Sequence, residues 1–278
     1  AIVYALAASV SKKALFEGSG LIRLSFAMNQ CFLLVFLLYA FGSLREIQLE
    51  NLLWPVLAGL FFFTAQILTL TAIKVGDISL QTPLMGIKVL LVVLLVGVAG
   101  IETIPSEIAL AAFLATLAVA LLGFSGGGAK RVGLTIFLAI LSSFFFALTD
   151  IVVGVHGEEY GVRAFVLVMI FTNSICACGL IPFFSGPLRA MPLKSLPWVV
   201  GAGLLMGLQA LLMTYALATY QAISAINILY TTRGLWSVVL ASPLAYCMAM
   251  PLESVSRRIF IQRFLGALLM LVAIALSF

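Results

Sequence analysis

Two basic residues stand inside otherwise apolar stretches of the chain, where a charge is costly. Lys88 lies near the centre of the stretch 77–100, and Arg233 lies near the centre of the stretch 222–246. A cation at the middle of a membrane costs about 2.5–3.5 kcal/mol on insertion scales. A lysine point charge and a planar guanidinium together suit an anionic group, so we expect an anion-binding site. The alternative is a structural pair of cations neutralised by carboxylates such as Asp77 and Asp150.

Helical spacing predicts which polar side chains accompany these cations. Gln81 lies seven residues before Lys88, and Tyr230 lies three residues before Arg233, so each pair shares a helix face. Polar groups near the middle of other apolar stretches can bind a substrate or bridge neighbouring helices. The candidate substrate-binding residues are therefore Lys88, Arg233, Gln81, Gln66, Gln209, Asn227 and Tyr230.

Asp150 is the acidic residue placed well inside an apolar stretch. It can carry a coupling proton, or it can pair with Lys88 or Arg233 in the empty protein, and the sequence leaves both roles open. His156, the single histidine, is expected in a solvated loop after a helix that ends near residue 154. The four cysteines form no spaced cluster with histidine or carboxylates, so we expect small buried hydrophobic groups, with no metal and no cofactor.

Long apolar helices must position these residues. Hydrophobic residues make up 64% of the 278 residues and charged residues 9%, whereas a soluble domain has roughly a quarter charged residues. Because a spanning helix needs about 20 apolar residues, ten helices with short loops fill the chain. Since the chain starts at Ala1 in apolar sequence, we expect a helix there and not a signal peptide. Apolar runs and turn residues predict helices at 1–16, 20–42, 52–73, 77–100, 106–124, 132–154, 164–184, 196–218, 222–246 and 259–278.

The same composition excludes several classes of function. The net charge of +5 comes from 15 Lys and Arg against 10 Asp and Glu, and in a membrane protein such an excess reflects loop orientation, not a nucleic-acid partner. The glycine-rich stretch 125–128 lacks the GK[ST] ending of a phosphate loop, which argues against ATP coupling. An intramembrane protease needs facing Ser and His residues, and no HExxH or DDxxD metal motif occurs, so we expect no enzyme.

The two halves of the sequence match at a shared offset. Shifted by 144 residues, the first half places three residues on identical residues of the second half, namely Asn29 on Asn173, Gly59 on Gly203 and Ala72 on Ala216. After one inserted residue, Ser79 falls on Ser224 and Lys88 on Arg233. Because each repeat would contain an odd number of helices, the second half would lie inverted in the membrane relative to the first half. The sequence therefore predicts an all-α membrane protein of ten transmembrane helices in two inverted five-helix repeats, 1–124 and 132–278, joined by the linker 125–131.

These features together resemble a known group of carriers. Lys12 or Lys13 near the end of the first helix, the segments AIKVGDIS (72–79) and ALATYQAIS (216–224), and Glu102 after the fourth helix are similar to the drug/metabolite transporter superfamily, EamA-like branch. The resemblance implies a central cavity lined by Gln66, Gln81, Lys88, Asp150, Gln209, Asn227, Tyr230 and Arg233. Sugar-phosphate and nucleotide-sugar carriers of that superfamily use basic residues on the fourth and ninth helices, which Lys88 and Arg233 resemble. Asn29 departs from the arginine common early in the second helix.

We therefore expect a secondary transporter for a small organic anion, a carboxylate or a phosphorylated metabolite, that works by alternating access as an exchanger or a proton-coupled carrier. The alternatives are an exporter of neutral or zwitterionic amino acids and metabolites and, more remotely, an intramembrane enzyme. The expected partners are a small-molecule metabolite and the lipid bilayer, with no nucleic acid. We expect a monomer or homodimer, integral and multi-pass, in a bacterial inner membrane or an organellar membrane.

Overall fold

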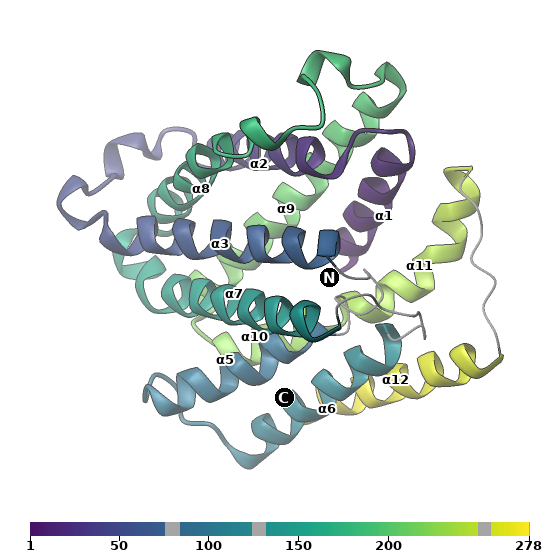
Figure 1. The fold of residues 1–278 in the computed structure, drawn as a ribbon. Helices are drawn as coiled ribbons and strands as arrows, with labels where there is room; N and C mark the ends of the chain where they lie inside the picture. The colour runs from purple at the N-terminus through teal and green to yellow at the C-terminus, as the bar shows by residue number, and fades with distance from the viewer. Residues whose placement is uncertain (76–83, 124–131, 250–256, 278) are drawn as a thin grey trace.

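A computed structural model describes residues 1–75, 84–123, 132–249 and 257–277 (Figure 1). Within these ranges the regular secondary structure is helical and no strand occurs. Two loops carry short 3-10 turns, η1 (Ser43–Glu46) and η2 (Leu49–Asn51) in the first, and η3 (Ile181–Phe183), η4 (Leu188–Ala190) and η5 (Leu193–Ser195) in the second. The α-helices are α1 (Ile2–Phe16), α2 (Leu21–Tyr39), α3 (Leu53–Val75), α5 (Ile87–Val98), α6 (Ser106–Gly123), α7 (Val132–Tyr160), α8 (Val162–Cys178), α9 (Leu196–Tyr220), α10 (Ile223–Tyr230), α11 (Arg233–Cys247) and α12 (Arg257–Leu276).

Four of the described helices are long and apolar enough to cross a membrane, at Leu21–Tyr39, Leu53–Lys74, Gly133–Tyr160 and Leu193–Tyr220. The rise of 1.5 Å per residue makes the 19-residue α2 about 29 Å long, close to the roughly 30 Å of a hydrocarbon core. Further apolar helices are shorter, among them α5 and α8. The all-helical expectation is thus confirmed for the described residues, and the lengths are consistent with a membrane protein.

The distribution of polar and apolar side chains fits a lipid environment. Large apolar side chains lie on the surface, such as Leu38 and Val98, which are 69% and 81% exposed. Polar side chains lie inside, such as Asn29 and Asp150, which are 1% and 7% exposed. In a water-soluble protein an apolar surface of this extent marks an interaction site, whereas lipid tails solvate it without cost.

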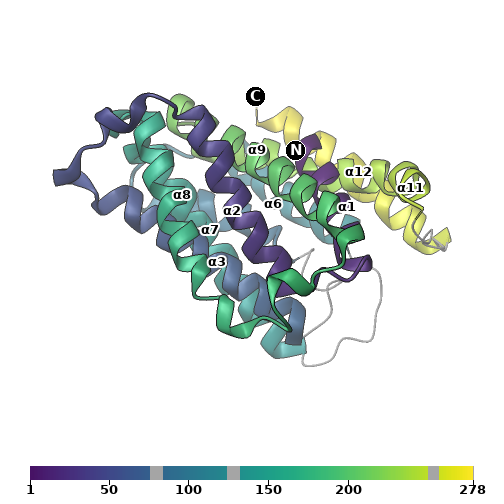
Figure 2. The same cartoon turned by 90° about the horizontal axis from the view of Figure 1, so that it is seen from above.

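The helices pack in two groups that meet where α5 packs against α7 and where α1 packs against α11 (Figures 1 and 2). In one group, α3 packs against α7 and α8, and α2 packs against α8 and α9. In the other, α6 packs against α5 and α12. The first helix, α1, packs against α9 and α11, so it reaches the second half of the chain. The views place α8 at one end of the molecule and α11 with α12 at the other.

Three expectations about local structure were wrong. The stretch 222–246 is not one helix, because it breaks between α10 and α11 at Thr231 and Thr232. Their hydroxyl groups donate to the carbonyls of Ile228, at 2.5 Å, and Leu229, at 2.8 Å, and such bonds compete with the helical ladder.

The second error concerns His156, which lies within α7 and not in a loop, since that helix continues to Tyr160. The His156 ring stacks on Trp54 with ring centroids 3.9 Å apart, and Gln221 donates a 2.7 Å hydrogen bond to Glu158. Tertiary contacts therefore extend the helix past the end of its apolar run. The third error concerns Cys178 and Cys247, which are exposed and not buried.

Candidate functional site

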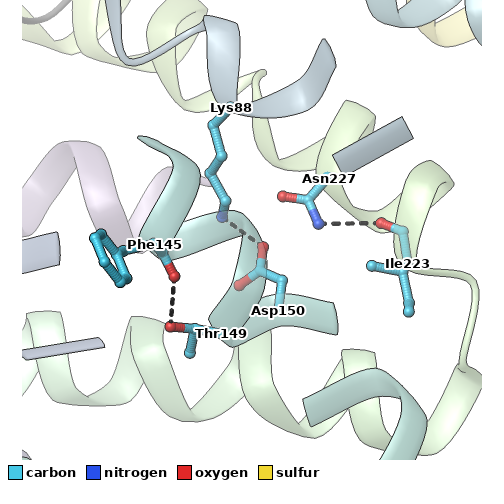
Figure 3. Close-up of polar contacts among 6 residues, drawn as sticks. All are labelled: Lys88, Phe145, Thr149, Asp150, Ile223 and Asn227. Carbon is cyan, nitrogen blue, oxygen red and sulfur yellow. Dashed lines mark hydrogen bonds and ion pairs between the residues drawn. The ribbon is translucent and has the colours of Figure 1, made fainter. Parts of the chain in front are cut away.

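Lys88 and Asp150 form a buried ion pair. Lys88, in the first turn of α5, places Nζ 2.5 Å from Oδ2 of Asp150, which lies in α7 (Figure 3). Both residues are 7% exposed. An isolated buried charge is costly, and the pair neutralises both charges. Of the two roles that the sequence leaves open for Asp150, this conformation displays the pairing.

Arg233 is held between two tyrosine rings. Its Cζ lies 4.4 Å from the ring centroid of Tyr230 and 4.8 Å from that of Tyr4. These contacts are each worth about 0.5–2 kcal/mol, depending on solvation. All three residues are half-buried, whereas Lys88 is buried. Within the described part of the chain, Arg233 makes no ion pair.

Tyr230 brings the two cations together. Lys88 Nζ lies 5.7 Å from the same Tyr230 ring that Arg233 faces, so the cationic centres lie within about 10 Å of each other. At that distance two cations repel by about 1.7 kcal/mol for an effective dielectric constant of 20. Asp150 offsets this repulsion, and the three charges together leave the cluster with a single positive charge. The distances thus agree with the expected convergence of Lys88 and Arg233.

The break between α10 and α11 places Arg233 at the N-terminus of a helix, which also favours an anion beside it. Arg233 is the first residue of the 15-residue α11, and no side chain caps this helix start. The helix dipole puts partial positive charge at an N-terminus, where a cation is disfavoured and an anion is stabilised. An anion bound beside Arg233 would therefore compensate both the guanidinium and the start of the helix.

Asn227 adds an unsatisfied acceptor beside the ion pair. Its Nδ2 donates to the carbonyl of Ile223, at 3.1 Å, and its Oδ1 is buried without a hydrogen-bond partner in the described ranges. Figure 3 shows this oxygen on the side of Asn227 that faces Lys88 and Asp150. A buried polar atom left unpaired costs about 1–3 kcal/mol. A water molecule or a substrate donor would relieve that cost.

Two of the three candidate glutamines, Gln66 and Gln209, make no recorded contact with this cluster. Gln66 accepts a hydrogen bond from Asn29 Nδ2, at 2.9 Å, and donates one to Asn173 Oδ1, at 3.4 Å, so both ends of its amide bridge helices. Gln209 is 9% exposed on α9 and makes no hydrogen bond that the structure records for the described residues. Gln81 lies outside the described residues.

Glu102 makes a contact that sequence reasoning did not anticipate. Its carboxylate accepts hydrogen bonds from the backbone N–H of Ile223, at 2.6 Å, and of Ser224, at 3.3 Å, and so caps the start of α10. The residue before α10, Ala222, offers no side-chain cap. No local pattern reveals this contact, because Glu102 lies 121 residues away along the chain.

An open pocket of about 440 Å³ lies beside this cap and is lined by Glu102, Ile104, Tyr220 and Ser224 among others. It lies at the N-terminal end of α10 and does not include Lys88 or Arg233. We place the candidate site at the charged cluster, because the buried ion pair of Lys88 and Asp150 and the unpaired oxygen of Asn227 occur together there.

Comparison with known proteins gives a fold and no family. No protein-family model and no curated protein matches the sequence. The fold is similar to that of a solved protein crystal structure, with a TM-score of 0.73 over 99% of this chain and 95% of that chain. The two sequences are 13% identical, so the similarity concerns the fold alone.

Proposed function

We propose that the protein is a secondary transporter that carries a small organic anion, a carboxylate or a phosphorylated metabolite, by alternating access. The observation that carries the proposal is the cluster of Lys88, Asp150 and Arg233 among apolar helices. Intramembrane ionisable groups are expensive and mark substrate or ion pathways in membrane proteins. Because the cluster retains one positive charge, it favours an anion. The amine of a zwitterion would have to displace Lys88 from Asp150.

The architecture that we propose for this transporter is two inverted five-helix repeats, 1–124 and 132–278. Contacts between positions 144 residues apart support it. Asn173 Nδ2 donates to Asn29 Oδ1 at 2.7 Å, and Ser174 Oγ donates to Gln30 Oε1 at 2.7 Å. A residue that touches its own counterpart lies close to a two-fold axis.

Close helix contacts that occur in both directions between the halves support the same two-fold relation. A Cβ atom on Gly59 would lie 2.8 Å from Thr172, and one on Gly203 would lie 3.3 Å from Met28. Gly203 and Thr172 are the counterparts of Gly59 and Met28 at the offset of 144, so the contact of the first half with the second is repeated in reverse. Such repeats are typical of secondary transporters, and the resemblance to the drug/metabolite transporter superfamily points the same way.

Within this proposal, Arg233 attracts the anion and Lys88, paired with Asp150, lines the site beside it. Tyr230 forms a wall of the site, and Asn227 accepts a hydrogen bond from the substrate. Asp150 neutralises Lys88 in the empty protein and carries the coupling proton if transport is proton-coupled. Gln66 and Gln209 remain proposed as substrate contacts in other conformations, and Gln81 remains a proposed substrate contact. The transporter uses no metal or cofactor in this scheme.

A thermal-shift screen of the purified protein against organic anions, amines and sugars tests the function. A ligand present at 100 times its dissociation constant stabilises the folded protein by about 2.7 kcal/mol. We expect carboxylates or phosphorylated metabolites to raise the melting temperature, and the same anions to drive counterflow in liposomes. Stabilisation by amines alone, or anion binding without counterflow, contradicts the proposal.

A further inference from the structure

We infer, building on the proposed function, that the site selects organic anions with a single negative charge, held as a carboxylate by Arg233, and discriminates against dianions. The charges of the cluster carry this inference. Asp150 lies 2.5 Å from Lys88 and cancels its charge, so only Arg233 is left to be neutralised by a substrate. Lys88 and Asp150 are buried, and a charge imbalance among buried groups is weakly screened by solvent.

A second negative charge on the substrate would find no unpaired cation among the described residues of the cluster once Arg233 is bound. Lys88 is already engaged, and the Asp150 carboxylate beside it repels an anion. To bind a dianion, the protein would have to break the ion pair and leave Asp150 buried and unpaired. A monoanion leaves the pair intact and brings the cluster to neutrality.

The surroundings of Arg233 favour a planar carboxylate that carries an apolar body. Tyr4 and Tyr230 both turn ring faces toward the guanidinium, with their own ring centroids 6.1 Å apart at an interplanar angle of 79°. The guanidinium fork pairs with a carboxylate through two parallel hydrogen bonds. The aromatic rings then offer apolar surface to the rest of the molecule.

Asp150 is therefore the residue that sets the charge preference of the site. The Asp150→Asn variant frees Lys88 and raises the charge of the cluster by one, so dianions should gain affinity. The double variant Lys88→Met with Asp150→Asn restores the single positive charge without the ion pair, so it should prefer monoanions again. Replacing both partners of a buried pair is often neutral for folding, which makes the double variant the matched control.

Binding of dicarboxylates and their monomethyl esters tests the inference, because each pair shares a carbon skeleton and differs in charge. The ligands are succinate, glutarate and phthalate with their monoesters, measured by isothermal titration calorimetry on the purified protein at about pH 7.5, where all their carboxyl groups are ionised. For the skeleton that fits, we expect the monoester to bind the parent protein at least tenfold more tightly than the diacid. Asp150→Asn should remove or reverse the preference for the monoester over the diacid, and the double variant should restore that preference.

Three outcomes overturn the inference. They are equal or tighter binding of diacids by the parent, an unchanged ratio in Asp150→Asn, and a dianion preference in the double variant. If Asp150→Asn does not fold, the ratios of the parent and the double variant still decide. If the parent binds neither member of any pair and no other organic anion, the proposed function itself fails. That result differs from anion binding with the wrong charge preference.

Discussion

Asn29 of α2 and Asn173 of α8 are joined by a 2.7 Å hydrogen bond although they are 144 residues apart, which is the offset at which the halves of the sequence match. Gln66 closes the triad through hydrogen bonds to both. The two asparagines are almost fully buried. On the proposed architecture this triad marks the axis between the repeats and ties them together.

Removing one asparagine of this triad should destabilise the protein. Asn29→Ala or Asn173→Ala leaves buried amide groups unpaired, at a cost of about 1–3 kcal/mol. The double variant should lower the free energy of unfolding by less than the sum of the two single variants, because the two asparagines share hydrogen-bond partners. Thermal unfolding in detergent measures the effect, with the exposed Asn51→Ala as control. Additive costs in the double variant would show that the asparagines act separately.

The two related glycines should tolerate no side chain. Gly59→Ala places Cβ 2.8 Å from Thr172, and Gly203→Ala places it 2.6 Å from Cys31, so each should lower stability by about 1–3 kcal/mol. Gly133 of α7 has nothing within 4 Å of the added atom, so Gly133→Ala should be neutral or stabilising by up to about 1 kcal/mol. Melting temperatures that are equal for all three variants would contradict these close helix contacts.

Loss of the Glu102 cap should loosen the start of α10. A missing N-cap costs about 0.5–2 kcal/mol, so Glu102→Ala should speed hydrogen exchange of the Ile223 and Ser224 amides roughly two- to thirtyfold. Glu107→Ala, at an exposed site in the first turn of α6, serves as control. Hydrogen exchange read by mass spectrometry reports on this segment directly. Unchanged exchange in Glu102→Ala would mean that the cap does not hold α10.

Lys88 should matter for folding through its ion pair with Asp150. Lys88→Ala strands the buried Asp150 carboxylate, which costs about 3–5 kcal/mol, whereas Lys88→Met with Asp150→Asn should stay near the parent. The exposed Lys194→Ala is the control in a thermal unfolding series. A single variant as stable as the parent, while the double variant is destabilised, would contradict the ion pair.

The sequence predicts the helices well because their apolar runs are long, and it fails where single side chains decide. The hydroxyl groups of Thr231 and Thr232 break the stretch 222–246, yet threonine is also common in unbroken membrane helices. The stacking of His156 on Trp54 lengthens α7, and this contact joins residues 102 positions apart. Contacts of this kind leave no local pattern.

The charged residues of the site could be predicted from the sequence, but not which cation Asp150 pairs with. The expense of a charge in an apolar stretch points to Lys88, Asp150 and Arg233 from sequence alone. Which cation Asp150 neutralises depends on how α5 and α7 pack, and the sequence leaves both pairings open. The placement of Tyr4 against Arg233 likewise depends on the packing of α1 on α11.

Anion affinity of the Arg233 variants tests the central claim most directly. The measurement is isothermal titration calorimetry of the tightest-binding organic anion with the parent protein, Arg233→Lys, Arg233→Ala and Arg163→Ala. Arg163 makes a similar contact with Tyr39, at 5.6 Å, outside the cluster, so it is a matched control. A hydrogen bond to a charged group is worth about 1.5–3 kcal/mol, which predicts a loss of roughly 10- to 150-fold for Arg233→Ala. Arg233→Lys keeps the charge without the fork and should fall between Arg233→Ala and the parent, while Arg163→Ala should match the parent. Equal affinities of Arg233→Ala and the parent would contradict an anion site at Arg233.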